Sequence, residues 1–202
     1  MVNFLIMKYT DQQLINQVER EALGFDGWKK GAYDIWVRKN DTPADMDKFN
    51  DKVYSFVVPE EGATPVFKMV CTGTSHAGSY GLKNWREYNS KGCAVLRSNT
   101  IVYESHVWGR HKNYTAYRQA KPFPYFRDDD CDNLAEEIGP VYWDIIFANC
   151  HRAAAQGESV RIYNWSVACL VRNNAAQWFK WLGFMDKEMK RAPLSVCILK
   201  EF

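Results

Sequence analysis

The sequence predicts a mainly β domain with short helices, a β-rich α+β fold. Runs in which apolar and polar side chains alternate with a period of two dominate the first half of the chain, as in half-buried strands. Helical spacing of apolar residues is confined to two short stretches, one near each end. No repeat or Pro/Ser-rich linker interrupts the chain. With 202 residues, of which 47% are hydrophobic, the chain can bury one core, which excludes global disorder.

The first half is predicted to form a helix followed by three strands. Apolar residues share one face of a helix over 11–23, with Thr10 or Asp11 as its N-cap and Gly24 as its stop. The loop 72–82 is rich in glycine and hydroxyl side chains, a composition typical of loops that line sites. Turn formers favour an antiparallel meander of three strands, over 32–38, 52–58 and 64–72.

The second half is predicted to add shorter strands, a helix and a closing strand. Two apolar runs, 142–148 and 162–165, lead into the segments that carry His151 and Cys169. The other expected elements are a helix over 174–182, ended by Gly183, and strands over 94–96, 100–103, 114–120 and 194–199.

Charge and cysteine content limit the classes of function. The net charge of +2 gives no electrostatic reason to expect a nucleic-acid or membrane partner. The opening apolar stretch, 2–7, is too short for a secretory signal or a membrane span. The six cysteines form no CxxC pair, so we expect buried, reduced thiols. The oligomeric state is not predictable from these features.

His151 and Cys169 are the pair of residues most suited to chemistry. A cysteine attacks an acyl group as the thiolate, so it needs an imidazole nearby and donors directed at the developing oxyanion. His151 follows an apolar run, and Cys169 follows a turn of small residues that precedes a helix. The backbone N–H groups of Val167, Ala168 and Cys169 are candidates for the oxyanion hole.

The spacing of this pair resembles a known signature. Fourteen residues separate His151 from Ser166-Val167-Ala168-Cys169. This pattern resembles the catalytic motif of the L,D-transpeptidase family, in which a His precedes Ser/Thr-His-Gly-Cys at a similar interval. The order of meander, Thr-Gly loop, His strand, Cys turn, helix and last strand is also similar. The resemblance implies an L,D-transpeptidase-like β-sandwich over 31–202, with 1–30 as an N-terminal helical extension.

The resemblance also implies roles for individual residues. Cys169 would be the acylated nucleophile, His151 its general base and then acid, and Ser166 a polar support. Arg172 is the candidate for gripping a peptide carboxylate, because a guanidinium fork suits that group. Three positions depart from the family: Val167 replaces His, Ala168 replaces Gly, and Arg172 lies three residues after the cysteine rather than two.

Further candidates for substrate binding come from the glycine-rich loop and an aromatic residue. Thr72 and Gly73 resemble the family's Ser-Thr-Gly segment, although the proline of the following turn is missing. His76 is a candidate to replace the lost motif histidine. Trp165, next to Ser166, is a candidate to line a groove.

The activity implied is cysteine-dependent acyl transfer on peptidoglycan stem peptides. With an amine acceptor this is L,D-transpeptidation, and with water it is L,D-carboxypeptidase or endopeptidase activity. The alternative is a catalytically degenerate virion or cell-wall-binding protein of the same fold. Because the sequence predicts no signal peptide, we expect cytoplasmic synthesis, with phage- or virion-mediated delivery if the protein acts on the wall.

Two patterns raise metal binding, and neither is convincing. The acidic run 128–133 resembles the start of a calcium loop, but Asn133 and Gly139 occupy positions that need glycine and glutamate. His106 and His111 have a usable spacing but no third ligand nearby in the sequence. We therefore expect no metal and no cofactor.

Overall fold

The computed structural model describes residues 8–40 and 42–202. The prediction of a mainly β fold with short helices is confirmed: the described residues form eleven strands, three α-helices and one 3-10 helix. No helix within these ranges is long and apolar enough to cross a membrane. The apolar stretch 2–7, considered above as a signal, lies outside the described residues.

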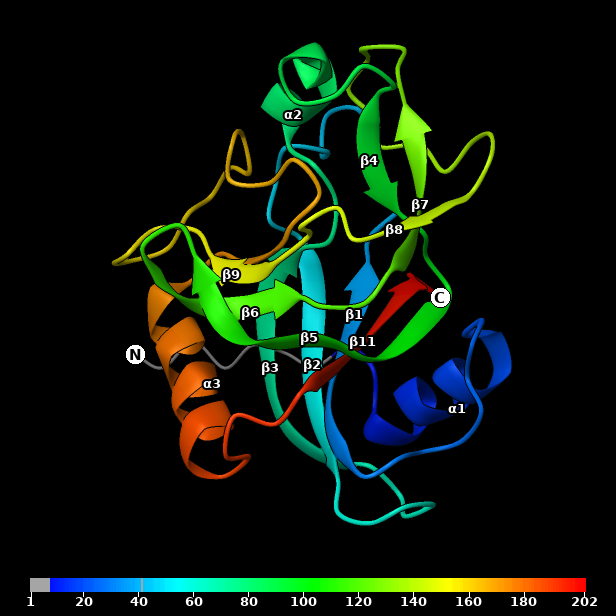
Figure 1. Cartoon of the computed structure of the whole chain (residues 1–202), viewed down its shortest axis with the longest axis vertical. Helices are drawn as coiled ribbons and strands as arrows, with labels where there is room; N and C mark the ends of the chain where they lie inside the picture. Colours follow the sequence, from blue (N-terminus) through cyan, green and yellow to red (C-terminus); the bar gives the residue numbers. More distant parts are fainter. Residues whose placement is uncertain (1–7, 41) are drawn as a thin grey trace.

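Eight of the strands close into a barrel, in the order β1-β11-β5-β6-β9-β10-β3-β2 (Figure 1). The predicted antiparallel meander is its β1-β2-β3 part. Two neighbouring pairs, β1 with β11 and β9 with β10, run parallel. The barrel strands are β1 (Gly31–Arg38), β2 (Asp51–Val58), β3 (Val66–Thr74), β5 (Thr100–His111), β6 (Tyr114–Gln119), β9 (Cys150–Arg152), β10 (Leu170–Arg172) and β11 (Leu194–Lys200).

Helices α1 (Asp11–Glu21) and α3 (Ala175–Lys187) lie at opposite sides of the barrel (Figure 1). The N-cap of α1 is Thr10, which forms a reciprocal capping box with Gln13. Leu14 and Val18 of α1 share a buried cluster with residues of β1, β2 and β11, so the described part of residues 1–30 packs directly on the barrel.

Helix α3, which the sequence predicts over 174–182, differs from its prediction at its C-terminal end. Gly183 does not end α3, which continues to Lys187. Phe184 and Met185 are buried in the core cluster that contains Trp178 and Trp181. The apolar face of the helix therefore extends past the glycine, and this packing overrides the local preference for a stop.

A second, three-stranded sheet stands beside one end of the barrel (Figure 1). It has the order β4-β7-β8, formed by Cys93–Leu96, Phe123–Asp128 and Tyr142–Asp144. The short helices α2 (Ser79–Lys83) and η1 (Trp85–Glu87) precede it in the chain. The sequence predicted the fold class but neither the closed barrel nor the small sheet. The β-sandwich implied by the family resemblance stays a prediction.

One strand prediction needs correction, and the two apolar runs of the second half are mostly irregular. The run 142–148 is a strand only over Tyr142–Asp144, because Ile145 and Phe147 are exposed and form an irregular segment. The run 162–165 forms no strand. In contrast, β5 continues to His111, past an irregularity at Glu104, whose φ of 52° interrupts the alternation on which the prediction depends.

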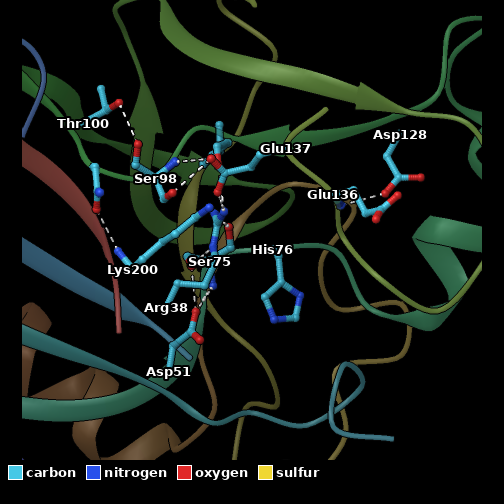
Figure 2. A network of polar contacts seen from close by, with 12 residues as sticks. Arg38, Asp51, Ser75, His76, Ser98, Thr100, Asp128, Glu136, Glu137 and Lys200 are labelled. Atoms are coloured by element: carbon cyan, nitrogen blue, oxygen red, sulfur yellow. Dashed lines mark hydrogen bonds and ion pairs between the residues drawn. The ribbon is translucent and has the colours of Figure 1, made fainter. Parts of the chain in front are cut away.

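A buried polar network joins the small sheet to the barrel (Figure 2). Arg38, at the end of β1, donates to Glu137 Oε1 at 2.9 Å, to Leu96 O and to Ser75 O. Asp51 accepts from the backbone N–H and the hydroxyl of Ser75, both at 2.7 Å. The network fixes the loop that follows the acidic run 128–133 against the barrel.

Candidate active site

The site lies where β9 and β10 run side by side. In this parallel pair, His151 is opposite Val171 and Cys150 is opposite Leu170. Alternate side chains of a strand point to opposite faces. Cys150 and Leu170 belong to the cluster inside the barrel, whereas His151 points outward and is 1% exposed.

Cys169 immediately precedes β10, and the N–H of Leu170 anchors that turn on Asn149 O at 3.0 Å. The sulfur atom of Cys169 and one ring nitrogen each of His151 and His111 lie within 4.8 Å of one another. Ser166 braces the same turn, because its hydroxyl donates to Cys169 O at 2.8 Å. The fold thus brings together the two residues that the sequence paired.

The hydrogen bonds of His151 determine its tautomer. Nδ1 lies 2.7 Å from Arg152 O, and since a carbonyl only accepts, Nδ1 carries the proton. The Tyr114 hydroxyl lies 3.1 Å from Nδ1 and donates to the same carbonyl. Nε2 is buried, has no hydrogen-bond partner in the described structure, and holds a free lone pair. His151 is therefore oriented as a proton acceptor.

His111, at the end of β5, is the residue that sequence reasoning left out of this site. Its ring stacks on His151 with centroids 3.9 Å apart and planes at 11°. Asn149 Nδ2 donates to His111 Nδ1 at 3.2 Å, and Asn149 Oδ1 accepts from the Gln119 N–H, which fixes the amide orientation. Nε2 of His111 consequently carries the proton. One histidine of the stack offers a lone pair and the other an N–H.

Burial keeps both reacting groups neutral. It lowers the pKa of His151 to about 3, and the neighbouring His111 lowers it further in the same direction. Burial also raises the pKa of the Cys169 thiol to about 11, against the smaller opposing effects of the Asn149 backbone N–H and the Lys112 charge. The thiol donates to Phe147 O at 3.7 Å and makes no hydrogen bond to His151. The resting pair is a thiol and an imidazole, not an ion pair.

Cys169 lines a pocket of about 380 Å³. Val167 and Ala168 line it too, and no hydrogen bond within the described chain uses the backbone N–H of these three residues. Apolar side chains form most of the wall, and Arg127 supplies a cationic group. The other lining residues are Trp85, Tyr88, Asn89, Gly92, Cys93, Ala94, Ile145, Ile146 and Phe147.

The prediction that Arg172 grips a substrate carboxylate is wrong. Its side chain is fully buried inside the barrel, where Nη2 pairs with Asp34 Oδ2 at 2.6 Å and Nη1 donates to Cys150 Sγ at 2.9 Å. The guanidinium also lies 4.0 Å from the ring centroid of Trp181. It reaches no solvent and no substrate.

Four other candidates do not line this pocket. His76 lies beside the Arg38 network, with Nδ1 donating to Ala77 O, and lines a separate hollow (Figure 2). Thr72 accepts from Lys52 on the barrel wall. Gly73 pairs with β10 so closely that a Cβ would come within 2.6 Å of Val171 O. Trp165 is exposed and is not among the residues that line the pocket.

The residues of the two sequence patterns considered for metal binding form hydrogen bonds within the protein instead. Asp128, Asp130 and Asp132 accept backbone N–H groups of their own loop. His106 is buried and donates from Nε2 to Ala148 O. The cluster of His111, His151 and Cys169 has the right atoms for a metal, but the in-plane lone pairs of two parallel, stacked rings do not converge on one ion. The arrangement suits proton transfer better.

His111 and Tyr114 are the paired end residues of the β5-β6 hairpin, and the tight turn at Lys112 and Asn113 is the signal that could have placed them together. Nothing local in the sequence indicates that this hairpin end faces His151. Comparison with protein-family models, with curated proteins and with solved structures finds no match to this chain. The function therefore has to be inferred from the geometry of the site.

Proposed function

We propose that the protein is a cysteine-dependent acyltransferase or peptidase in which Cys169 is the nucleophile and His151 the general base. The observation that carries this proposal is that the Cys169 sulfur lies within 4.8 Å of a ring nitrogen of the buried His151, while Cys169 also lines an open pocket. Following the resemblance of the motif, the substrate is a peptidoglycan stem peptide.

The neutral resting pair determines how the first step runs. Nε2 of His151 takes the thiol proton as sulfur attacks the substrate carbonyl, so charge develops only during the reaction. The N–H groups of Val167, Ala168 and Cys169 are the candidates to stabilise the oxyanion. The leaving amine then takes the proton from His151, and a thioester remains. An amine acceptor gives transpeptidation, and water gives hydrolysis.

The test is formation of a covalent adduct with a carbapenem, an acyl electrophile, followed by intact-protein mass spectrometry. We expect one adduct that is absent in Cys169→Ala and forms about 10² to 10⁴ times more slowly in His151→Ala, the usual contribution of a general base. The matched control is Cys131→Ala, because Cys131 is a partly exposed thiol that accepts from Arg86 at 3.2 Å. That variant should react like the parent.

The pH dependence distinguishes this mechanism from an ion pair. Since His151 is neutral above about pH 3 and the Cys169 thiol is protonated up to about pH 11, adduct formation should show no inflection between pH 5 and 8. A plateau reached through an inflection in that range would indicate a standing thiolate–imidazolium pair.

One observation favours the alternative of a degenerate, wall-binding protein: the thiol bonds to Phe147 O rather than to His151. If the folded parent forms no adduct at Cys169, acyl transfer is excluded as its activity. Sedimentation with purified cell-wall sacculi then measures wall binding directly. If the adduct forms, digestion of peptidoglycan with product masses separates cross-linking from hydrolysis.

A further inference from the structure

We propose that Arg127 selects acyl donors that carry a free carboxylate, and that it fills the role which the sequence assigned to Arg172. The inference rests on the proposed function, because it places the carboxylate in the same pocket as Cys169. Arg127 belongs to β7 of the small sheet, and no sequence motif includes it.

The Arg127 guanidinium is held in place without being neutralised. Nη1 donates to Gly92 O at 3.0 Å, Nη2 donates to the Tyr125 hydroxyl at 3.3 Å, and the group lies 4.8 Å from the Tyr125 ring centroid. These partners are neutral, and they leave part of the five-donor fork available. The group is therefore oriented before any ligand arrives.

The other arginines in the interior behave differently. Arg38 is paired with Glu137, and Arg172 with Asp34. No carboxylate of the described residues forms an ion pair with Arg127. The adjacent Asp128 accepts from the Glu136 N–H instead, and burial raises its pKa to about 6. Arg127 also lines a second hollow with Asp128, Asp129, Asp130 and Glu136. None of these carboxylates pairs with it in the described structure, so its guanidinium can still bind an external anion.

The rest of the pocket defines the ligand. Arg127 and Cys169 both line the space of about 380 Å³, and Ile145, Phe147 and Trp85 contribute apolar wall. A guanidinium fork matches a carboxylate through two parallel hydrogen bonds. The ligand is thus a short peptide whose carboxylate lies a few bonds from the carbonyl that Cys169 attacks.

The experiment compares alkylation of Cys169 by iodoacetate, which is anionic, and iodoacetamide, its neutral analogue, using peptide mapping by mass spectrometry. Because both reagents alkylate the same sulfur and release iodide, the ratio of their rates cancels the cost of removing the thiol proton. We expect this ratio to fall about tenfold in Arg127→Gln, the worth of one charge-assisted contact, and to be largely retained in Arg127→Lys. Arg118→Gln, which removes an exposed arginine of β6, should leave it unchanged.

Cys131 in the same digests serves as an internal control, since its ratio should not respond to Arg127→Gln. An unchanged ratio at Cys169 in a folded Arg127→Gln variant overturns the inference and leaves the proposed function standing.

A second measurement does not depend on a reactive thiol. In Cys169→Ala, calorimetric titration should show N-acetyl-alanyl-alanine binding about tenfold more tightly than its C-terminal amide, and Arg127→Gln should remove the difference. The two proposals can fail separately. If Cys169 of the parent protein forms no carbapenem adduct but Cys169→Ala still binds the peptide acid more tightly than the amide, the proposed function fails and the role of Arg127 is supported. Equal binding, or no binding of either peptide, overturns it.

Discussion

The two faces of β9 and β10 show how one pair of three-residue strands places two different sets of polar side chains. Inside the barrel, Arg172 contacts both Asp34 and Cys150, and the ion pair of Arg172 and Asp34 is fully buried. On the outer face, the buried His151 and the half-buried Cys169 have no ionic partner in the described structure. The strands alternate between these faces at single-residue steps.

The difference lies in what accompanies burial. Asp34 raises the pKa of Arg172 and overcomes the desolvation that would lower it. His151 and Cys169 have no such partner, so desolvation makes both neutral. A paired charge lies in the barrel interior, whereas a neutral thiol and a neutral imidazole lie near each other beside a pocket, as the proposed mechanism requires. Burial alone therefore does not distinguish the candidate site; the missing counter-charge and the open pocket do.

The largest effect is expected from breaking the inner pair. Asp34 accepts from Arg172 and from the Ser55 hydroxyl, so Asp34→Asn leaves a buried guanidinium without its counter-charge. We expect the free energy of unfolding to fall by about 3 to 5 kcal/mol, measured by urea denaturation. Glu21→Gln is the matched control, because its pair with Arg20 is exposed and should contribute less than about 1 kcal/mol. Equal losses in both variants would contradict the comparison.

Part of this contrast was predictable from the sequence and part was not. The meander β1-β2-β3 follows from period-two alternation in strands of eight or nine residues. The pair His151 and Cys169 follows from its motif. In contrast, β10 has three residues, too few for alternation to show that Arg172 points inward. Its partner Asp34 is 138 positions away in the chain.

The same limit explains the residues that were missed. His111 reaches the site because β5 extends past the irregularity at Glu104 and ends beside His151. Arg127 reaches the pocket because the small sheet stands against the Cys169 turn. Both placements depend on how distant strands are arranged in space, and no local pattern records that arrangement.

The next effect sharpens the comparison through pH. The pKa of His106 is lowered to about 4 and that of His151 to about 3, so the unfolded chain takes up protons near pH 6.5 that the folded chain does not. Stability is therefore lost as the pH falls, by about 2 kcal/mol for each histidine between pH 7 and 5. Asp128, with its pKa raised to about 6, takes up a proton on the folded side and offsets about 1 kcal/mol.

Urea denaturation at pH 7 and pH 5 measures the net loss, which we expect to be about 2 to 3 kcal/mol. His106→Gln can keep the donor to Ala148 O while removing a titrating group, and should reduce the pH dependence by about half of the histidine contribution. If that variant shows the same dependence as the parent, His106 is not buried in its neutral form.

The smallest effect tests which group fixes the outer histidine. Tyr114→Phe removes a hydroxyl near His151 Nδ1 but leaves the ring against the Arg152 guanidinium and the stronger contact of Nδ1 with Arg152 O at 2.7 Å. We expect a loss of about 1 kcal/mol in unfolding free energy, the usual worth of one hydrogen bond. The rate of carbapenem adduct formation at Cys169 should change less than about threefold, since the carbonyl still holds the proton on Nδ1. A decrease as large as that of His151→Ala would show that the Tyr114 hydroxyl, and not the strand backbone, sets the tautomer of His151. The outer face would then depend on a side-chain partner, as the inner face depends on Asp34.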